Sequence, residues 1–269
     1  MENNERDDLL AKVLPALSTQ LRYALGNLHL AAASLVPAER REQDAQLDAQ
    51  AAVLDQSFYR LLRLANNLTA AAYLSESDTL PLRDCDIVEL VRDICLQSSS
   101  LAEQLGLQLS FSCRKESHVC AIHRDSVEQL LFQLLSNAFK FTPRGGSVAV
   151  ELTVSGRQVR LTVNDTGSGI NPQKMETLFS ACSEDELRLP SHGVGLGLAL
   201  CRRIAQSHGG TILVESKKGT RVTVAIPDRQ SGTPMLKDVP FDYTGGFNHT
   251  LLGLADALPV SAFRVRQQD

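Results

Sequence analysis

Two glycine-rich segments near the middle of the chain carry residue types that suit the binding of a nucleotide. Residues 165–170 read Asp-Thr-Gly-Ser-Gly-Ile, and residues 193–198 read Gly-Val-Gly-Leu-Gly-Leu. A buried carboxylate such as Asp165 is costly unless it accepts hydrogen bonds, and the exocyclic amine of a purine would supply one. Gly167 and Gly169 have no side chains, so the backbone there can lie against a planar base.

The second glycine-rich segment is suited to phosphate groups. Gly193, Gly195 and Gly197 come at the start of a predicted helix over residues 197–208. Backbone N–H groups and the helix dipole can therefore meet negative charge at this position. A dinucleotide-binding βαβ unit does not fit, because no strand directly precedes these glycines and no parallel βαβ unit follows them.

An earlier segment, predicted as a helix over residues 125–140, offers amide and ammonium groups. Gln133 and Asn137 lie four residues apart on one helix face. An amide oxygen there suits Mg²⁺, and Lys140, one turn further, can meet a phosphate as a point charge. Taken alone, a D-x-G-x-G sequence is more often a surface turn, Asn137 can be a surface amide and Lys140 a solvated charge. Their joint occurrence in this order favours a nucleotide site.

A mixed pattern after Pro81 supplies the elements that position these residues. Helices are predicted over residues 87–104, 125–140 and 197–208, and strands over 107–113, 119–122, 147–154, 158–163, 211–215 and 220–226. Asp125 is the expected N-cap of the middle helix, with Glu128 completing a capping box. The pattern predicts an α+β fold, a layered sheet with helices on one face.

The N-terminal part of the chain carries two apolar seams with a seven-residue repeat. The seams are Leu10, Leu14, Leu17, Leu21, Ala24, Leu28, Ala31 and Leu35, and then Leu47, Ala51, Leu54, Phe58, Leu61, Ala65, Leu68 and Ala72. Pro37 lies in the polar connection between them, so we expect an antiparallel helical hairpin. A lone hairpin buries little, which favours a homodimer that forms a four-helix bundle. The alternative is a hairpin packed only on the second domain.

These patterns divide the chain into three parts. We expect the helical hairpin over residues 1–78, the ligand-binding domain over 79–228 and a tail of unknown role over 229–269. Residues 251–259 of the tail can form a short apolar helix, either packed on the second domain or serving as a docking surface for a partner.

The composition narrows the class of protein. A net charge of −4 gives no electrostatic case for nucleic acid or an anionic membrane as partner. No apolar run approaches a membrane span of about 18 residues and no signal-peptide pattern opens the chain, so we expect a cytoplasmic protein or the cytoplasmic part of a longer one. The six cysteines show no metal-ligand spacing, and we interpret them as structural thiols rather than a disulfide or metal set.

Together, these segments resemble the Bergerat-fold ATPases, the family of gyrase-type topoisomerases, the large heat-shock chaperones and sensor histidine kinases. The similarity is greatest to the histidine kinases and covers residues 8–227. Residues 134–142 resemble the family's N box, 165–170 its G1 box and 193–200 its G2 box. Phe179 corresponds to the F box, and Gly219-Thr220 to the late phosphate-side motif.

The resemblance implies ATP and Mg²⁺ as ligands. Asp165 would bind adenine, Phe141 would pack on the base, and Asn137 would hold Mg²⁺. The remaining positions implied to line the nucleotide are Lys140, Gly193, Gly195, Gly197, Leu198 and Thr220, and residues 180–192 would form a lid. In two places the chain departs from the pattern: Gln133 replaces a second Asn at the metal position, and the lid lacks the usual basic or aromatic pair.

The hairpin resembles the dimerisation and phosphotransfer domain of the same kinases, but the phosphoacceptor is missing. Residues 18–25 align with the H box, with Thr19 at the histidine and Gln20 at the adjoining acid. A threonine hydroxyl needs a base to become a nucleophile, and an amide cannot act as one. His29 lies ten residues on, about 15 Å along the helix, too far to replace it. We interpret His118, His123, His192 and His208 as surface or cap residues.

Three functions remain open. The first is a nucleotide-binding homodimeric scaffold that has lost autophosphorylation on histidine, with a response regulator or other signalling protein as its partner. The second is a kinase for a Ser or Thr hydroxyl, in itself at Thr19 or Ser18, or in another protein. The third is a switch driven by ATP hydrolysis. The sequence shows no obvious general base for hydrolysis, because the helix presents Gln133 and the nearest acid, Glu128, is more than a turn away. We favour the first.

Overall fold

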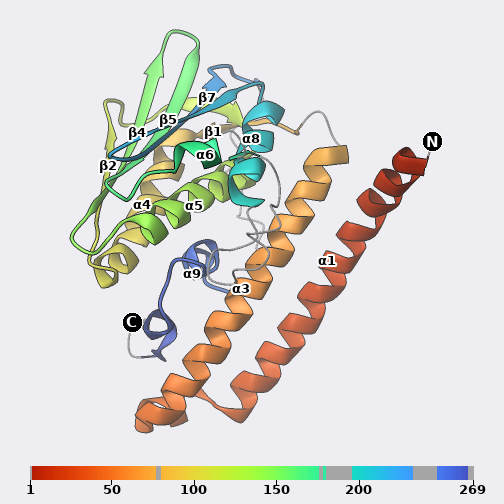
Figure 1. Ribbon diagram of the computed structural model, residues 1–269, viewed down its shortest axis with the longest axis vertical. Coiled ribbons are helices and arrows are strands. Elements are labelled where there is room, and N and C mark those ends of the chain that lie inside the picture. The colour runs from red at the N-terminus through yellow and green to blue at the C-terminus, as the bar shows by residue number, and fades with distance from the viewer. Residues whose placement is uncertain (1, 77–79, 176–177, 180–195, 233–246, 266–269) are drawn as a thin grey trace. The chain divides into compact units, whose positions relative to one another are not determined.

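The structure is a computed structural model that describes residues 2–76, 80–175, 178–179, 196–232 and 247–265 (Figure 1). It divides into two compact units. The helical unit comprises residues 1–77 together with 258–269, and the sheet unit comprises residues 78–257. The described part of the tail is therefore shared: residues 258–265 pack with the helices, and residues 247–257 pack with the sheet unit.

The predicted N-terminal hairpin is confirmed. Helix α1 (Glu2–Leu35) and helix α3 (Ala45–Glu76) run antiparallel and in contact, joined through the short helix α2 (Ala38–Gln43) (Figure 1). Pro37 is the N-cap residue of α2. It therefore lies between the two helices, after α1 ends and immediately before α2 begins. The short helix η2 (Val260–Phe263) packs on α3, where the Tyr59 and Phe263 rings lie 5.5 Å apart.

The first seam lies outside the contact between α1 and α3. Leu17, Leu28 and Leu35 of this seam are 58%, 67% and 75% exposed in the single chain. The positions one residue later are less exposed: Ser18 and Leu25 are buried, at 3% and 5%, and His29 is half-buried. The hairpin therefore closes through a second stripe of α1 and leaves the leucine seam on the surface.

The sheet unit contains a five-stranded mixed sheet in the order β2-β4-β5-β7-β6. The strands are β2 (Gln108–Cys113), β4 (Ser147–Ser155), β5 (Gln158–Asp165), β6 (Thr211–Lys217) and β7 (Gly219–Pro227). Only the β2–β4 pair is parallel. A separate antiparallel ribbon pairs β1 (Arg83–Asp86) with β3 (Val119–Ile122). The predicted strands are confirmed, apart from shifts of one or two residues at their ends.

Helices cover one face of this sheet, as predicted (Figure 1). They are α4 (Ile87–Gln104), α5 (Arg124–Phe141) and α8 (Leu196–Ser207), with the four-residue α6 (Pro172–Met175) after β5. Alternate residues of β5, Val159, Leu161 and Val163, are buried beneath them, which gives the strand its apolar and polar alternation. Helix α9 (His249–Leu254) packs on α4 and α5, so the short tail helix lies on the sheet unit.

The predicted N-cap of α5 is wrong. The cap is His123, whose Nδ1 accepts a hydrogen bond from the Ser126 N–H at 3.3 Å. Asp125 falls inside the first turn, where its charge still favours the positive end of the helix dipole. An imidazole nitrogen can cap a helix in the same way as a carboxylate, and the usual cap residue types do not reveal it.

No helix in the described part of the chain is long and apolar enough to cross a membrane.

Candidate functional site

Asp165, the last residue of β5, joins the first glycine-rich segment to the start of β7. Its Oδ1 accepts hydrogen bonds from the Gly167 N–H at 2.8 Å and the Thr220 N–H at 3.1 Å. The side chain is only 8% exposed. Burial raises the pKa of this carboxyl, and the hydrogen bonds from Gly167 and Thr220 oppose the shift. The result is a buried, oriented acceptor at the end of the sheet.

Two glycines make this arrangement possible through close backbone approach. A side chain on Gly219, at φ +85°, would run into the backbone carbonyl of Asp165. A side chain on Gly167 would meet the Phe141 carbonyl, which accepts a hydrogen bond from the Ser168 N–H at 3.3 Å. Gly167 therefore lets the loop lie against the end of α5, a role that the sequence did not reveal.

The amides of α5 face the first turn of α8. A Cβ built on Gly197 would lie 3.1 Å from Gln133 Oε1 and 3.9 Å from Asn137 Nδ2. Gln133 is buried and Asn137 is half-buried. The structure therefore brings together both candidate metal ligands and the last glycine of the second segment. Leu198, in the same turn of α8, is also half-buried.

Lys140 and Phe141 lie at the end of α5. The Lys140 Nζ is 5.4 Å from the centre of the Phe141 ring, within the range of a cation–π contact. Phe141 is 45% exposed, which is unusual for a phenylalanine and leaves its ring open to a partner. Its backbone carbonyl contacts the loop after Asp165, so this ring and the buried carboxylate belong to one edge of the sheet unit.

Part of the predicted site lies outside the described residues: Gly193, Gly195 and the lid over 180–192. The F-box residue Phe179 is described. Its ring centre lies 5.4 Å from the Arg202 guanidinium of α8. This contact joins Phe179 to α8, the helix that begins within the second glycine-rich segment.

Ser216 of β6 is a site residue that the sequence analysis missed. Its Oγ accepts a hydrogen bond from the Ile170 N–H at 2.7 Å and lies 3.2 Å from the Gly219 carbonyl oxygen, to which it donates. It thereby holds the loop after Asp165 against the β6–β7 turn. Because 46 residues separate Ser216 from Ile170, no local pattern could have indicated this role.

Thr19 and Gln20 lie on α1 in the helical unit. Thr19 is half-buried, and its Oγ1 accepts a hydrogen bond from Arg22 Nη2 at 3.5 Å. Gln20 is exposed. His29 is packed inside the hairpin, with its ring 4.3 Å from that of Phe58. The pKa of His29 lies below its ordinary value, mainly because the ring is partly buried; Asp55 opposes this shift and Arg41 adds to it. The contact with Phe58 gives this imidazole a packing role.

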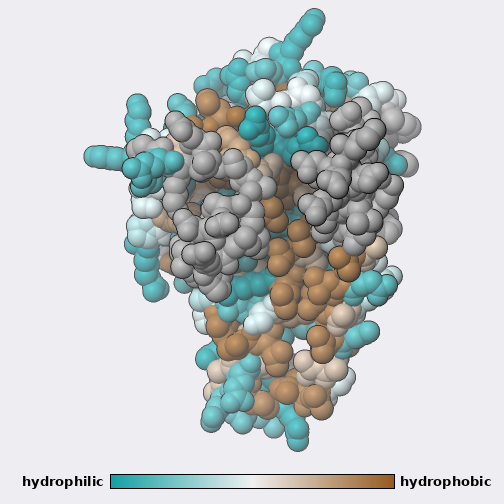
Figure 2. Space-filling view, turned by 45° about the vertical axis from the view of Figure 1, so that its right-hand side comes forward, coloured by the Kyte–Doolittle hydropathy of each residue, from teal (hydrophilic) through white to brown (hydrophobic). Residues whose placement is uncertain are grey.

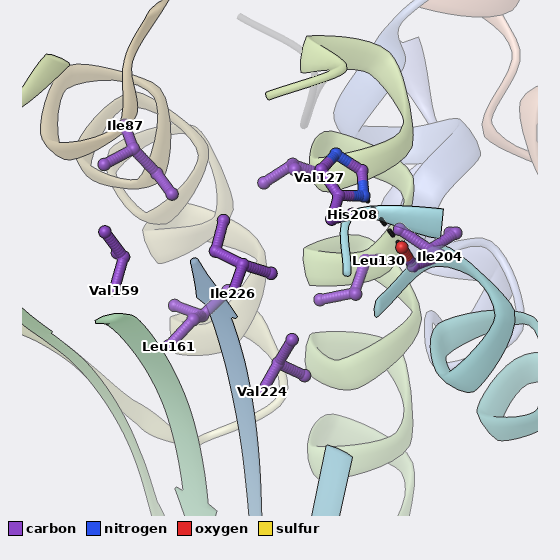
Figure 3. Close-up of a pocket in the computed structure, with 9 residues that line it drawn as sticks. All are labelled: Ile87, Val127, Leu130, Val159, Leu161, Ile204, His208, Val224 and Ile226. Atoms are coloured by element: carbon purple, nitrogen blue, oxygen red, sulfur yellow. Dashed lines mark hydrogen bonds between the residues drawn. The ribbon is translucent and has the colours of Figure 1, made fainter. Parts of the chain in front are cut away.

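A cavity in the sheet unit lies away from these polar groups (Figure 3). Its nine lining residues are Ile87, Val127, Leu130, Val159, Leu161, Ile204, His208, Val224 and Ile226. His208 is the polar member, and both ring nitrogens are engaged: Nδ1 donates to the Ile204 carbonyl at 2.7 Å, and Nε2 accepts from the His123 N–H at 3.0 Å. The cavity is therefore an apolar space in the core rather than a nucleotide site.

Comparison with known proteins agrees with this geometry. Residues 122–230 match the family model described as histidine kinase-, DNA gyrase B- and HSP90-like ATPase. The adaptive-response sensory kinase SasA of Synechococcus is 31% identical over 227 residues, which is 80% of this chain and 58% of that protein. The sensor protein SrrB of Staphylococcus aureus strain N315 is 30% identical over 234 residues, 84% of this chain and 40% of that protein.

Two solved structures are similar in fold. Full-length ShkA in complex with AMPPNP is 26% identical, with a TM-score of 0.65 over 83% of this chain and 47% of that one. A catalytic domain of the histidine kinase ThkA is 24% identical, with a TM-score of 0.51 over 56% of this chain and 97% of that one. The chain spans about half the length of the curated relatives it matches.

Proposed function

Because residues 122–230 belong to the histidine kinase-, DNA gyrase B- and HSP90-like ATPase family and the chain is a relative of sensor histidine kinases, we propose that it is a homodimeric, Mg-ATP-binding signalling protein. In this proposal it does not phosphorylate itself on histidine. A response regulator or other signalling protein is its partner. The main support for nucleotide binding is the carboxylate of Asp165, which is buried and held in place by hydrogen bonds.

The adenine end of the proposed site rests on the chemistry of Asp165. Two backbone N–H groups use Oδ1. The exocyclic amine of adenine would donate to Oδ2, which offsets part of the cost of burying the charge. The exposed ring of Phe141 offers an apolar surface for the base. A similar protein, ShkA, was solved in complex with the ATP analogue AMPPNP, which supports this assignment.

The phosphate end rests on α5 and the first turn of α8. Mg²⁺ prefers oxygen ligands and keeps several waters, so the amide oxygens of Asn137 and Gln133 fit it without a carboxylate. The backbone N–H groups in the first turn of α8, including that of Gly197, have no acceptor within the helix and would meet phosphate oxygens. The described residues that complete this phosphate site are Lys140, Leu198 and Thr220. Gly193 and Gly195 are also proposed to bind phosphate, although they lie outside the described residues. Bound Mg²⁺ would neutralise phosphate charge.

The loss of histidine autophosphorylation rests on α1. Thr19 stands at the acceptor position, and the neighbouring Gln20 has an amide that cannot remove a proton. Ser18 is only 3% exposed, and His29 is packed against Phe58. A hydroxyl-directed kinase is the second candidate, and one observation favours Thr19 as its target. Thr19 is partly exposed, and its Oγ1 accepts a hydrogen bond from the Arg22 guanidinium.

The homodimer rests on the first seam. Leu17, Leu21, Leu28 and Leu35 recur along one side of α1 and remain exposed in the single chain. Leu54 and Leu61 of α3 are also 58% and 45% exposed. Brown, hydrophobic side chains are visible over much of the lower part of the view in Figure 2. A second copy would bury these leucines as the four-helix bundle requires.

Intact-protein mass spectrometry after incubation with Mg²⁺ and ATP tests this function. We expect no phosphate-sized gain of mass, together with an upward thermal shift that reports ATP binding. The matched variant is Asp165→Asn, which keeps an oxygen for the Gly167 and Thr220 N–H groups but presents an NH₂ group to the adenine amine. An unchanged ATP affinity in this variant would refute the pocket assignment. A phosphate that maps to Thr19 and requires Asp165 would establish the hydroxyl kinase instead.

A further inference from the structure

Cys85 and Cys120 stand directly opposite each other in the β1–β3 ribbon. We propose that these two thiols form a reversible disulfide when the protein meets a hydroperoxide, so that the ribbon is a site of redox modification. The proposal concerns the sheet unit alone and does not rest on nucleotide binding.

The register of the ribbon gives the two cysteines a suitable separation. Ile87 N–H donates to the His118 carbonyl at 3.0 Å just beyond the ribbon, and hydrogen-bonded pairs alternate along an antiparallel ladder. Cys85 and Cys120 are two positions further along each strand and therefore form another hydrogen-bonded pair. The Cα atoms of such a pair lie about 5.5 Å apart, inside the range of disulfides, and the side chains share one face.

The two thiols differ in accessibility. Cys120 is fully buried, whereas Cys85 is half-buried and can be reached from solvent. Burial raises the pKa of the Cys120 thiol to about 12, and repulsion from Asp228, Cys85, Asp86 and Asp84 adds to the rise. Arg124 Nη1 lies 3.8 Å from Cys85 Sγ, and a guanidinium at this distance favours a thiolate. A peroxide would therefore attack Cys85 first, and Cys120 would resolve the product.

The chemistry balances with the hydroperoxide as the only oxidant. The Cys85 thiol loses its proton, the thiolate attacks one peroxide oxygen, and the O–O bond breaks, so that Cys85 becomes a sulfenic acid. The second oxygen leaves with the proton that the thiol lost, as water or alcohol. The Cys120 sulfur then attacks the Cys85 sulfur and forms the S–S bond, while the S–O bond of the sulfenic acid breaks. The departing hydroxide takes up the proton of the Cys120 thiol and leaves as water. Two electrons pass from the thiols to the peroxide. A dithiol reductant reverses the reaction by thiol–disulfide exchange.

The other described cysteines lie in different settings. Cys113, also half-buried, is paired with Leu152 in the β2–β4 register. Cys95 and Cys201 are buried within helices α4 and α8, and Cys201 Sγ points to the Leu130 carbonyl at 3.8 Å. Cys113 is therefore a matched control, because it has similar exposure but no opposing thiol.

The disulfide would act at the start of α5. Strand β3 leads through the cap His123 into Arg124, the first residue of α5 and the donor to Cys85 Sγ. Oxidation would remove the thiol that Arg124 contacts and join β1 covalently to β3. Because a cross-link reduces the freedom of the unfolded chain, the oxidised protein should unfold at a higher temperature than the reduced protein.

The test treats the full chain with hydrogen peroxide, blocks remaining thiols by alkylation and maps cross-linked peptides by mass spectrometry. We expect a loss of two hydrogen atoms and one peptide pair that joins residues 85 and 120, reversed by a dithiol reductant. Cys113→Ala should behave as the unmodified chain does. In Cys120→Ala, Cys85 should remain a sulfenic acid that a dione probe captures.

Three results would overturn the proposal. The first is that Cys85 is oxidised without joining Cys120. The second is that Cys113 or Cys182 joins Cys85 as readily. The third is that Cys85→Ser leaves the yield of cross-link unchanged. Cys85 is half-buried and its serine variant conserves its size, so this variant keeps the test valid even if Cys120→Ala folds poorly.

Discussion

Asp165 connects its own loop to Thr220, which lies 55 residues further along the chain, because a single carboxylate oxygen accepts the N–H groups of Gly167 and Thr220. The glycines around it do two different jobs. Gly219 needs a positive φ and close approach to the Asp165 carbonyl, whereas Gly167 lets the loop touch the end of α5. At the scale of single residues, the glycines of this site are therefore needed for close packing of the backbone as much as for binding a ligand.

Gly219→Ala should therefore destabilise the protein and abolish nucleotide binding. The new Cβ would strike the Asp165 backbone, which we expect to cost about 3 kcal/mol of unfolding free energy or more. The control is Gly145→Ala, at nearly the same φ of +88° but with no described heavy atom within 4 Å of the added Cβ. That variant should lose only about 1–2 kcal/mol. Urea denaturation of both variants checks the prediction, and equal losses would contradict it.

His208 should make the protein less stable in mild acid. Its Nε2 accepts the His123 N–H, so protonation would place a second donor against that group. Burial lowers the pKa of His208, the hydrogen bond to the Ile204 carbonyl raises it, and His123 and Arg229 lower it further. With the folded pKa below the ordinary 6.5, the unfolded chain binds more protons, and stability falls as the pH drops through 6.5.

Denaturation at pH 7.5 and pH 5.5, about one unit on either side of an ordinary histidine pKa, checks this prediction. His208→Gln keeps an oxygen acceptor for the His123 N–H without a titrating ring, so its stability should depend less on pH. Part of the dependence should remain, because burial also lowers the pKa of His123. A variant with the full pH dependence of the parent chain would contradict the assignment.

At the scale of elements, α5 organises the sheet unit. The helix is buried against the sheet, and its second half carries Gln133, Asn137, Lys140 and Phe141. Helix α9 covers a further part of α5: Glu128 Oε1 lies 3.2 Å from His249 Nδ1, and the Phe132 ring lies against Gly253. The tail helix is thus part of the support for the candidate site.

Gly253→Ala should loosen α9. The added Cβ would meet the Phe132 ring, so the helix must shift away from α5, at a cost of about 1–3 kcal/mol. Gly26→Ala is the matched control, because Gly26 is also inside a helix but its added Cβ meets no described atom within 4 Å. We expect that control to be neutral or to stabilise the protein by up to about 1 kcal/mol. Hydrogen exchange of the α9 amides should rise only in Gly253→Ala.

At the scale of the whole molecule, the leucine seam of α1 is the feature that the single chain leaves unexplained. We predict that the chain is a dimer at micromolar concentration and that Leu28→Glu makes it monomeric, since a buried unpaired charge in the bundle is costly. Leu28 is 67% exposed in one chain, so the variant should fold normally. Leu96→Glu, at a position 65% exposed on α4, should remain dimeric. Sedimentation velocity distinguishes these outcomes.

The sequence by itself determined the order and type of the long helices and of the strands from β2 onward, because helix and strand periods, turn glycines and proline act locally. It did not reveal strand β1, which is only four residues long and pairs with β3. It also determined the kind of ligand to expect, since Asp165, the two glycine segments and Asn137 were recognisable by type and order. Tertiary structure alone decided what these residues touch. His123 as the cap of α5, Ser216 as a support for the loop and the pairing of Cys85 with Cys120 all depend on contacts between residues distant in sequence or on strand register. Such contacts are set by how elements pack, which no local pattern encodes.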